Sequence, residues 1–477
     1  MNLYEIFKLT LLSLKIEDEL RLSYLFSRKK NEIDSIKTKK NKFNGVFYRV
    51  LVFFRYIFVN FSFFERASKE VDVFLFSGSK NQLDSIRSTI LSLDKKNINN
   101  ILVSEGGHGL GRVGDLSVLF TPSVVMVALL VFFIKLPFLY IKVLRRKHDV
   151  ELNQYFSIYC RPYVLLPFFF QLLKKTRPNI VVMSNDHNVS NRSLRLAAEL
   201  LNIKTLYVQH ASVSNFFPPL EFDYALLDGR ESFYKYQECL STFDDVDFKV
   251  VENNKKCNVF LTGQKKETRF IAKNKSDFFT VGIPINKIDD LIFIENLIKK
   301  IRCNDVKCII RQHPTHKSCD ISRLRRVFLN DTLVDWSDPH NEYLPEYFSK
   351  IDIVVAGNTS IHLEAVLSGL PSFYVETNKD STYSDYYGYV RNGVSIALKN
   401  NFTTDFLMTE TKVFFDHDRL ISIKNYSETY NTRWENKEGV LTSLIIEKIL
   451  RGDETNSVFD YSDIEYEKVF FGFNRLQ

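Results

Sequence analysis

Residues 351–376 read IDIVVAGNTSIHLEAVLSGLPSFYVE and form the clearest strand–helix–strand unit in the chain. The apolar run IDIVVAG predicts a buried strand, TSIHLEAVLSG has the three- and four-residue apolar spacing of a helix, and PSFYVE predicts a second strand. Gly369 stands at the expected C-terminal cap of the helix, and Pro371 lies just beyond it. Because such a crossover places two parallel strands in one sheet, this region predicts an open α/β domain.

The same alternation of strands and helices recurs toward the N-terminus. One helix, over 190–203, has Ser190 as its expected N-cap. Strands are predicted at 71–77, 99–105, 178–184, 205–209, 222–228, 278–284, 307–314 and 332–337. We therefore predict two α/β domains in tandem, and four regions in all: helical residues 1–70, a first domain over 71–255, a second domain over 256–450 and a tail over 451–477.

The composition is that of an ordinary folded protein. Of the 477 residues, 45% are hydrophobic and 25% are charged, which excludes a disordered chain, a collagen-like fibre and a small disulfide scaffold. The net charge of +7 suits an anionic small molecule or an acidic membrane surface, and it does not demand nucleic acid. The six cysteines form no C-x-x-C pair, so they are interpreted as free thiols in a reducing compartment, and no metal site is expected.

A hydrophobic segment over 118–144 interrupts the α/β pattern. Residues 118–134 carry no charge, and Pro122 and Pro137 are expected to interrupt a helix there. At 17 residues this run is at the lower edge of what spans a bilayer, so spanning, lying on the membrane and being buried all stay open. Lys and Arg at 142–147 favour contact with anionic head groups. Since the N-terminus also lacks a signal-peptide cleavage site, we expect a cytoplasmic protein peripherally associated with the inner membrane.

The loops after two strands of the second domain carry the strongest candidate site. One strand delivers Arg311, His313 and Pro314, and the other delivers a Gly-Asn-Thr-Ser run at the start of a helix. Free N–H groups and hydroxyls at a helix N-terminus suit an anion, and a carboxylate one turn later can accept from ribose hydroxyls. The candidate donor-binding residues are Arg311, His313, Pro314, Gly357, Asn358, Thr359, Ser360 and Glu364.

These motifs resemble the donor domain of GT-B glycosyltransferases. RQHPTH followed by GNTSIHLEAVLSGLP is similar to bacterial capsule and lipopolysaccharide transferases, and His313–Pro314 and Thr359–Ser360 match the H-P and S-S/T motifs of bacterial sialyltransferases. The resemblance implies two Rossmann-like domains facing a cleft, with a nucleotide-sugar donor bound by the second domain. It also implies a glycan or lipid-linked acceptor and no cofactor, and it favours a CMP-activated donor such as a sialic acid or Kdo-like sugar. No metal is expected, because no D-x-D motif stands at a predicted strand end of the second domain.

The first domain supplies the candidates for catalysis and for the acceptor. Proton removal from an acceptor hydroxyl needs a carboxylate or imidazole that faces the donor. Asp228, Asp186, His210 and Glu105 stand at predicted strand ends, and Asp228 lies in a Leu-Asp-Gly run that lacks the first acid of the sialyltransferase motif. Glu105 and His108 are the expected acceptor-side residues; the glycine-rich loop 105–114 that they belong to lacks the G-K-[ST] of a P-loop.

Three alternatives to a glycosyltransferase share this fold. One is an isomerase of the UDP-sugar 2-epimerase type, and another is a polyol-phosphate transferase of the teichoic-acid type. The third is a non-catalytic assembly protein. The hydrophobic segment over 118–144 favours the transferase over the epimerase, and fold analogy alone does not decide between them.

Overall fold

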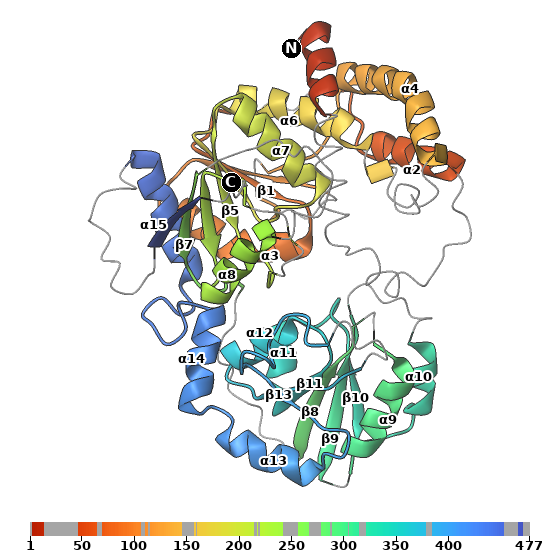
Figure 1. Ribbon diagram of the computed structural model, residues 1–477, viewed down its shortest axis with the longest axis vertical. Helices are drawn as coiled ribbons and strands as arrows, with labels where there is room; N and C mark the ends of the chain where they lie inside the picture. The colour runs from red at the N-terminus through yellow and green to blue at the C-terminus, as the bar shows by residue number, and fades with distance from the viewer. Residues whose placement is uncertain are drawn as a thin grey trace.

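The computed structural model shows an α/β protein with two largely parallel sheets in two domains (Figure 1). The structure describes the backbone of residues 2–13, 46–63, 69–105, 110–112, 115–145, 157–158, 160–213, 217, 220–241, 256–266, 278–286, 289–303, 305–313, 321–377, 384–452 and 466–470. The two sheets confirm the predicted fold class of two α/β domains.

The first sheet has the strand order β14-β7-β6-β5-β4-β1-β2-β3. Seven of these strands are parallel, and β14 pairs with β7 in the antiparallel direction. The strands are β1 (Val73–Ser77), β2 (Asn100–Ser104), β3 (Leu116–Ser117), β4 (Ile180–Met183), β5 (Lys204–Val208), β6 (Tyr224–Leu227), β7 (Lys256–Leu261) and β14 (Tyr466–Phe470).

Helices cover both faces of the first sheet, because its strands are apolar on both sides. On one face the side chains of Phe74 and Phe76 belong to a core shared with α6 (Pro162–Thr176), α7 (Val189–Leu200) and α8 (Arg230–Ser241). On the other face the alternate residues, Val73 and Leu75, belong to a core with α3 (Lys80–Lys95) and α15 (Glu438–Arg451). The strand period of two therefore separates the two layers.

The second sheet is entirely parallel, in the order β10-β9-β8-β11-β12-β13. Its strands are β8 (Phe279–Pro284), β9 (Val306–Arg311), β10 (Val334–Ser337), β11 (Ile353–Ala356), β12 (Ser372–Tyr374) and β13 (Ile396–Ala397). Its helices are α9 (Leu291–Ile301), α10 (Ser322–Val327), α11 (Leu344–Phe348), α12 (Ile361–Leu367), α13 (Thr404–Val413) and α14 (His417–Tyr426).

The domain boundary differs from the prediction at both ends of the second domain. β7 lies beyond the predicted boundary at 255, yet it pairs with β6 and so belongs to the first sheet. The predicted second domain includes α15, but this helix packs on α3 of the first, where a Cβ on Gly439 would lie only 2.3 Å from the Ser88 hydroxyl oxygen. The predicted tail contributes β14 to the same sheet. The chain therefore returns to its first domain after completing the second.

Two local predictions are corrected. The N-cap of α7 is Asn188, whose side chain accepts from the Asn191 N–H at 2.8 Å, and not Ser190. Pro137 does not end the hydrophobic helix: α4 runs from Pro122 to Arg145 through it. Pro122 itself begins α4, the position where a missing N–H matters least.

Apolar helices lie at one end of the first domain. α2 (Val46–Val59) packs on α4, with the Phe53 and Phe132 ring centroids 5.1 Å apart. On α4 the side chains of Met126, Leu130 and Phe133 are more than half exposed. Within the residues described, no helix combines the length and the hydropathy needed to cross a bilayer.

Candidate functional site

The two sheets direct the carboxyl ends of their strands at each other, and side chains bridge the domains there. Lys266, just after β7, places its Nζ atom 2.9 Å from Glu364 Oε1 on α12. After β5, the Ser212 Oγ atom lies 2.6 Å from the Tyr389 hydroxyl. At the start of α3 the Lys80 ammonium lies 5.7 Å from the Tyr343 ring centroid. We call the facing strand ends the interdomain site, because ligands of open parallel sheets bind at this edge.

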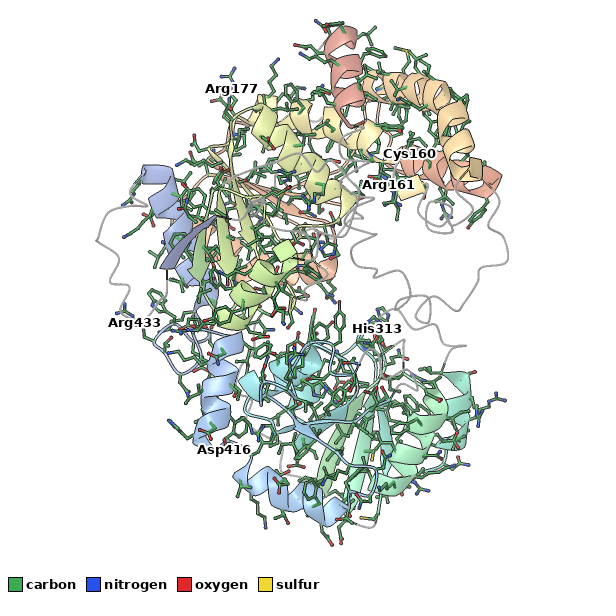
Figure 2. All side chains as sticks on the ribbon, in the orientation of Figure 1. Cys160, Arg161, Arg177, His313, Asp416 and Arg433 are labelled. Atoms are coloured by element: carbon green, nitrogen blue, oxygen red, sulfur yellow. The ribbon has the colours of Figure 1, made fainter. Side chains whose placement is uncertain are left out.

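The predicted phosphate-binding residues lie on the second-domain side of this site. His313 follows β9 and is half-buried, and Figure 2 shows it at the edge of the lower domain that faces the upper one. Thr359 and Ser360 are half-buried and precede α12. Pro314 lies outside the described residues. β9 and β11 are not adjacent in the sheet, because β8 lies between them.

Gly357 and Asn358 shape the loop around the site. A Cβ on Gly357 would lie 2.2 Å from the Thr377 hydroxyl oxygen, so the glycine is needed for the close approach of that residue. The Asn358 side-chain oxygen accepts from the Tyr386 N–H at 2.8 Å. The Asn358 carbonyl oxygen accepts from the side-chain amide of Asn286 at 2.6 Å. In the structure both residues hold neighbouring loops in place.

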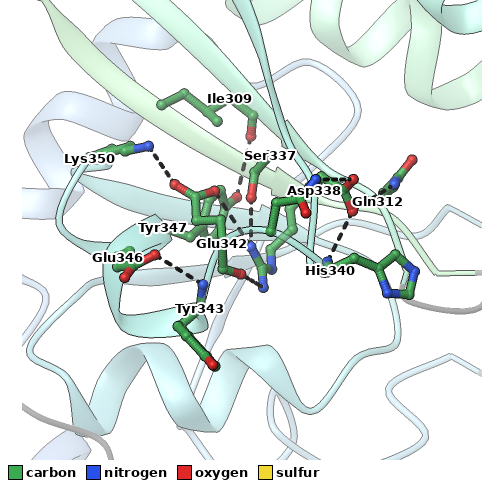
Figure 3. Close-up of polar contacts among 12 residues, drawn as sticks. Ile309, Gln312, Ser337, Asp338, His340, Glu342, Tyr343, Glu346, Tyr347 and Lys350 are labelled. Atoms are coloured by element: carbon green, nitrogen blue, oxygen red, sulfur yellow. Dashed lines mark hydrogen bonds and ion pairs between the residues drawn. The ribbon is translucent and has the colours of Figure 1, made fainter.

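The guanidinium of Arg311 is turned toward the loop before α11. It donates to the Ser337 hydroxyl at 2.6 Å and to the Glu342 carbonyl oxygen at 3.0 Å. It also lies 5.2 Å from the centroid of the Tyr347 ring. Figure 3 shows Ser337, Glu342 and Tyr347 gathered in this network. Arg311, predicted to bind the donor, therefore stabilises the loop before α11 in this structure.

Glu364 is the carboxylate that connects the domains. Its side chain is buried, and its Oε1 atom is the one that pairs with Lys266. Burial acts to lower the pKa of Lys266, but the charge and hydrogen bond of Glu364 raise it above the usual value. The ammonium is therefore held in its charged form at the interdomain site.

Asp186 is buried in a hydrogen-bonded network after β4. Its Oδ1 atom lies 2.7 Å from His187 Nδ1, and its Oδ2 atom accepts from the Tyr236 hydroxyl at 2.7 Å. Burial acts to raise the pKa of Asp186, but the hydrogen bonds from His187 and Tyr236 outweigh it, and the pKa lies below its usual value. Both carboxylate oxygens of this predicted catalytic residue thus have side-chain partners.

His210 follows β5, next to the Asp186 loop in the sheet. Burial and the charges of His187 and Lys266 lower the pKa of His210 to about 3. Its Nδ1 atom is buried and has no hydrogen-bond partner within the described part of the chain. His210 is therefore a neutral imidazole at physiological pH, with an unused acceptor.

Asp228 forms a buried ion pair with Lys265. The Lys265 Nζ atom lies 3.0 Å from Asp228 Oδ1, and the two side chains are 0% and 4% exposed. Burial raises the pKa of Asp228 to about 6, although the charge of Lys265 opposes the shift, and burial lowers the pKa of Lys265. The Asp228 carbonyl oxygen also accepts from the Glu428 N–H at 2.8 Å. This predicted catalytic residue lies where the chain returns from the second domain.

The acceptor-side candidates are only partly described. The two carboxylate oxygens of Glu105 accept from the Tyr56 hydroxyl, at 3.1 Å, and from the Ser190 hydroxyl. Glu105 thereby joins α2 and α7 across the end of β2. His108 lies outside the described residues. No group of histidine, cysteine and acidic residues that could hold a metal ion occurs within the described ranges.

Two residues of the site were not predicted from the sequence. Lys266 follows β7, which the prediction assigned to the second domain, so it was not expected on the first-domain side of the site. The two lysines of the GQKK run after that strand were the available signal. His187 stands next to the predicted Asp186, and its sequence position is equally typical of a turn. Asn185 does form an Asx turn there, accepting from the His187 N–H at 3.0 Å, and this turn sets the position of the imidazole.

Comparisons with known proteins give structural matches alone. No family model and no curated protein matches the chain. A putative UDP-N-acetylglucosamine 2-epimerase from Listeria monocytogenes is 12% identical with a TM-score of 0.48, covering 82% of this chain and 98% of its own. The UDP-GlcNAc 2-epimerase from Methanocaldococcus jannaschii is 13% identical with a TM-score of 0.49, covering 79% of this chain and 99% of its own.

A glycosyltransferase is matched to the same degree. The glycotransferase of kitacinnamycin is 13% identical with a TM-score of 0.49, covering 80% of this chain and 99% of its own. At these levels of similarity the matches assign neither an activity nor a substrate to this chain.

Proposed function

We propose that the chain is a glycosyltransferase that moves a sugar from a nucleotide donor to a glycan or lipid-linked acceptor. The observation that carries this proposal is the meeting of two sets of strand carboxyl ends, bridged by the Lys266–Glu364 ion pair at 2.9 Å. One domain can then hold the nucleotide while the other presents the acceptor and the groups that move its proton.

The donor nucleotide is proposed to bind against the second domain. His313, with Pro314 beside it, and the hydroxyls of Thr359 and Ser360 would donate to the phosphate. Lys266 adds a fixed positive charge nearby. Because Glu364 uses Oε1 for Lys266, its Oε2 atom is available to accept from a ribose hydroxyl. Fixed donors aimed at a departing phosphate stabilise the charge that develops there. The H-P and T-S motifs favour a cytidine monophosphate donor.

The acceptor is proposed to be presented at a membrane surface. Met126, Leu130 and Phe133 on α4, with Phe58 on α2, form an exposed apolar surface at one end of the first domain. Arg55, also on α2, is exposed within this region. Apolar side chains with interspersed cations suit the boundary between acyl chains and anionic head groups. Such a surface would bring the interdomain site to lipid-linked acceptors in capsule or lipopolysaccharide synthesis.

Turnover of defined donors tests the proposal. The purified protein is incubated with UDP-N-acetylglucosamine or with CMP-sialic acid, and the released nucleotide and the sugar products are quantified by chromatography and mass spectrometry. We expect slow release of one nucleotide with water as acceptor. Glu364→Gln should reduce this rate at least tenfold, while the matched control Glu410→Gln on α13 should not. Conversion of UDP-N-acetylglucosamine to its 2-epimer without nucleotide release would replace the transferase by an epimerase.

Sedimentation with phospholipid vesicles tests the membrane surface. Vesicles that contain an anionic lipid should bring down the wild-type protein, and the double variant Leu130→Ser, Phe133→Ser should stay in the supernatant. Leu329→Ser removes a leucine of the second domain that is even more exposed, at 75%, and serves as the control. Equal sedimentation of all three proteins, or none by the wild type, would contradict membrane association.

A further inference from the structure

Asp186 and His187 form a hydrogen-bonded pair at the carboxyl end of β4. Asp186 is 1% exposed, and its Oδ1 atom lies 2.7 Å from His187 Nδ1. Because an ionised carboxylate accepts only, the Nδ1 atom carries the proton of the neutral imidazole. That tautomer leaves the Nε2 lone pair available, and within the described residues Nε2 makes no hydrogen bond.

A buried network holds the carboxylate in place. The Tyr236 hydroxyl on α8 donates to Asp186 Oδ2 at 2.7 Å, and it lies 3.1 Å from the Tyr207 hydroxyl on β5. Residues of β5 and α8 thereby hold the carboxylate in place after β4. The backbone of the pair is fixed as well, since Asn185 Oδ1 accepts from the N–H groups of His187 and Asn188 at 3.0 and 2.7 Å.

The imidazole itself is accessible. The His187 side chain is 34% exposed, while its carboxylate partner is buried. The Phe217 ring lies with its centroid 4.9 Å from the imidazole and covers one side of it. The arrangement of a buried orienting acid and an accessible imidazole is the one that proton-abstracting sites use.

The pair lies next to the residues that bridge the domains. His187 and His210 follow the neighbouring strands β4 and β5, and both His187 and Lys266 act to lower the pKa of His210. Lys266 in turn binds Glu364 on α12 of the second domain. His187, His210 and Lys266 therefore follow β4, β5 and β7 at one edge of the first sheet, where Lys266 reaches the carboxylate proposed to hold the donor ribose.

We propose that His187 is the general base of the transfer reaction, with Asp186 as its positioning residue. This inference rests on the proposed function. An acceptor hydroxyl gives its proton to His187 Nε2 while its oxygen lone pair forms the bond to the anomeric carbon. The bond from that carbon to the nucleotide phosphate breaks, and its electron pair leaves with the phosphate oxygen. The imidazolium formed is stabilised by the Asp186 carboxylate, and the configuration at the anomeric carbon inverts.

The other candidate bases are engaged elsewhere. Both oxygens of Asp186 accept hydrogen bonds, and Asp228 is paired with Lys265. His210 has a pKa of about 3, and so weak a base removes a hydroxyl proton inefficiently at neutral pH. The titratable and charged groups that face the pair are Tyr207, His210, Tyr236, Cys239 and Arg192.

A pair of substitutions at one position separates proton transfer from positioning. His187→Asn keeps a side-chain N–H close to the Nδ1 position, so it can still donate to Asp186, but it has no group to take a proton. We expect donor turnover to fall about 10²–10⁴-fold, with nucleotide binding and melting temperature unchanged. His417→Asn on the exposed start of α14 is the matched control and should match the wild type.

The pH dependence supplies the second readout. The wild-type rate should fall on the acidic side as the base becomes protonated, and this acidic limb should be absent from the residual rate of His187→Asn. Turnover of His187→Asn at the wild-type rate, or with the same acidic limb, would overturn the assignment. If the wild type bound no nucleotide at all, the proposed function itself would fail, which is a distinguishable result.

Discussion

Replacing Lys265 by methionine tests the buried ion pair between Lys265 and Asp228. The substitution removes the ammonium but keeps an unbranched apolar chain in a side-chain position that is 0% exposed. Asp228 would then be a buried carboxylate without its counter-charge, which destabilises the fold until the carboxylate takes up a proton.

The size of the loss in stability follows from proton binding by Asp228. Asp228 can avoid the uncompensated charge by protonating. At pH 7 this costs about 1.36 kcal/mol for each unit between pH 7 and 3.8, the ordinary pKa of an aspartate in water, or about 4 kcal/mol. At pH 5 the same cost is only about 2 kcal/mol. In the wild type Asp228 already has a pKa of about 6, which accounts for about 3 kcal/mol of this cost before the substitution. We therefore expect Lys265→Met to lower the free energy of unfolding by only about 1–2 kcal/mol at pH 7, and by almost nothing at pH 5, where Asp228 is largely protonated in both proteins.

Urea unfolding followed by tryptophan fluorescence is a suitable assay. The chain has two tryptophans, Trp336 on β10 in the second domain and Trp434 beside the α3–α15 core of the first. The double variant Lys265→Met, Asp228→Asn should be more stable than either single variant, because it leaves no buried charge unpaired. A Lys265→Met protein as stable as the wild type at pH 7, a loss of stability that is the same at pH 5 and pH 7, or strictly additive effects in the double variant would refute this account.

Two further perturbations follow from the same contacts. The pKa of His362, buried and bonded to Ser372, is lowered to about 4 by burial, so its contribution of about 3 kcal/mol is fully present above pH 6.5 and is lost as the pH falls toward 4. Urea unfolding at pH 7.5 and 4.5 measures this, and an unchanged pH dependence in His362→Gln would contradict it. Gly263→Ala should destabilise by more than 1 kcal/mol, because φ is +70° and the new Cβ would lie 1.8 Å from the Thr429 hydroxyl oxygen. A melting temperature equal to that of the wild type would show that Thr429 moves aside freely.

Strands, and the loops that follow them, were predictable because both depend on local sequence. The apolar runs around 178–184 and 351–357 appear as β4 and β11, and the polar residues after them lie at the carboxyl ends as expected. Asp186, His210, His313 and Thr359 follow strands that the sequence predicts, and the structure places them after those strands. The period of two and the position of turn residues carry that information.

What was missed depends on contacts between distant segments. The pairing of β7 with β6 and the packing of α15 on α3 join residues that no local pattern connects. The bridging role of Lys266 follows only from that pairing. Whether Asp186 acts itself or orients His187 depends on the Tyr236 hydroxyl, 50 residues away in sequence. The direction in which such a side chain points is set by tertiary contacts, so local sequence does not predict it.

Calorimetric titration with CMP, UDP and GDP tests the central claim that a nucleotide binds between the facing strand ends. The account predicts saturable binding of one nucleotide per chain. Glu364→Ala should weaken it at least tenfold, or about 1.4 kcal/mol, while Glu410→Ala should bind like the wild type. If the folded wild-type protein bound none of the three nucleotides, or if Glu364→Ala bound as tightly as the wild type, the interdomain site would not be a sugar-nucleotide site.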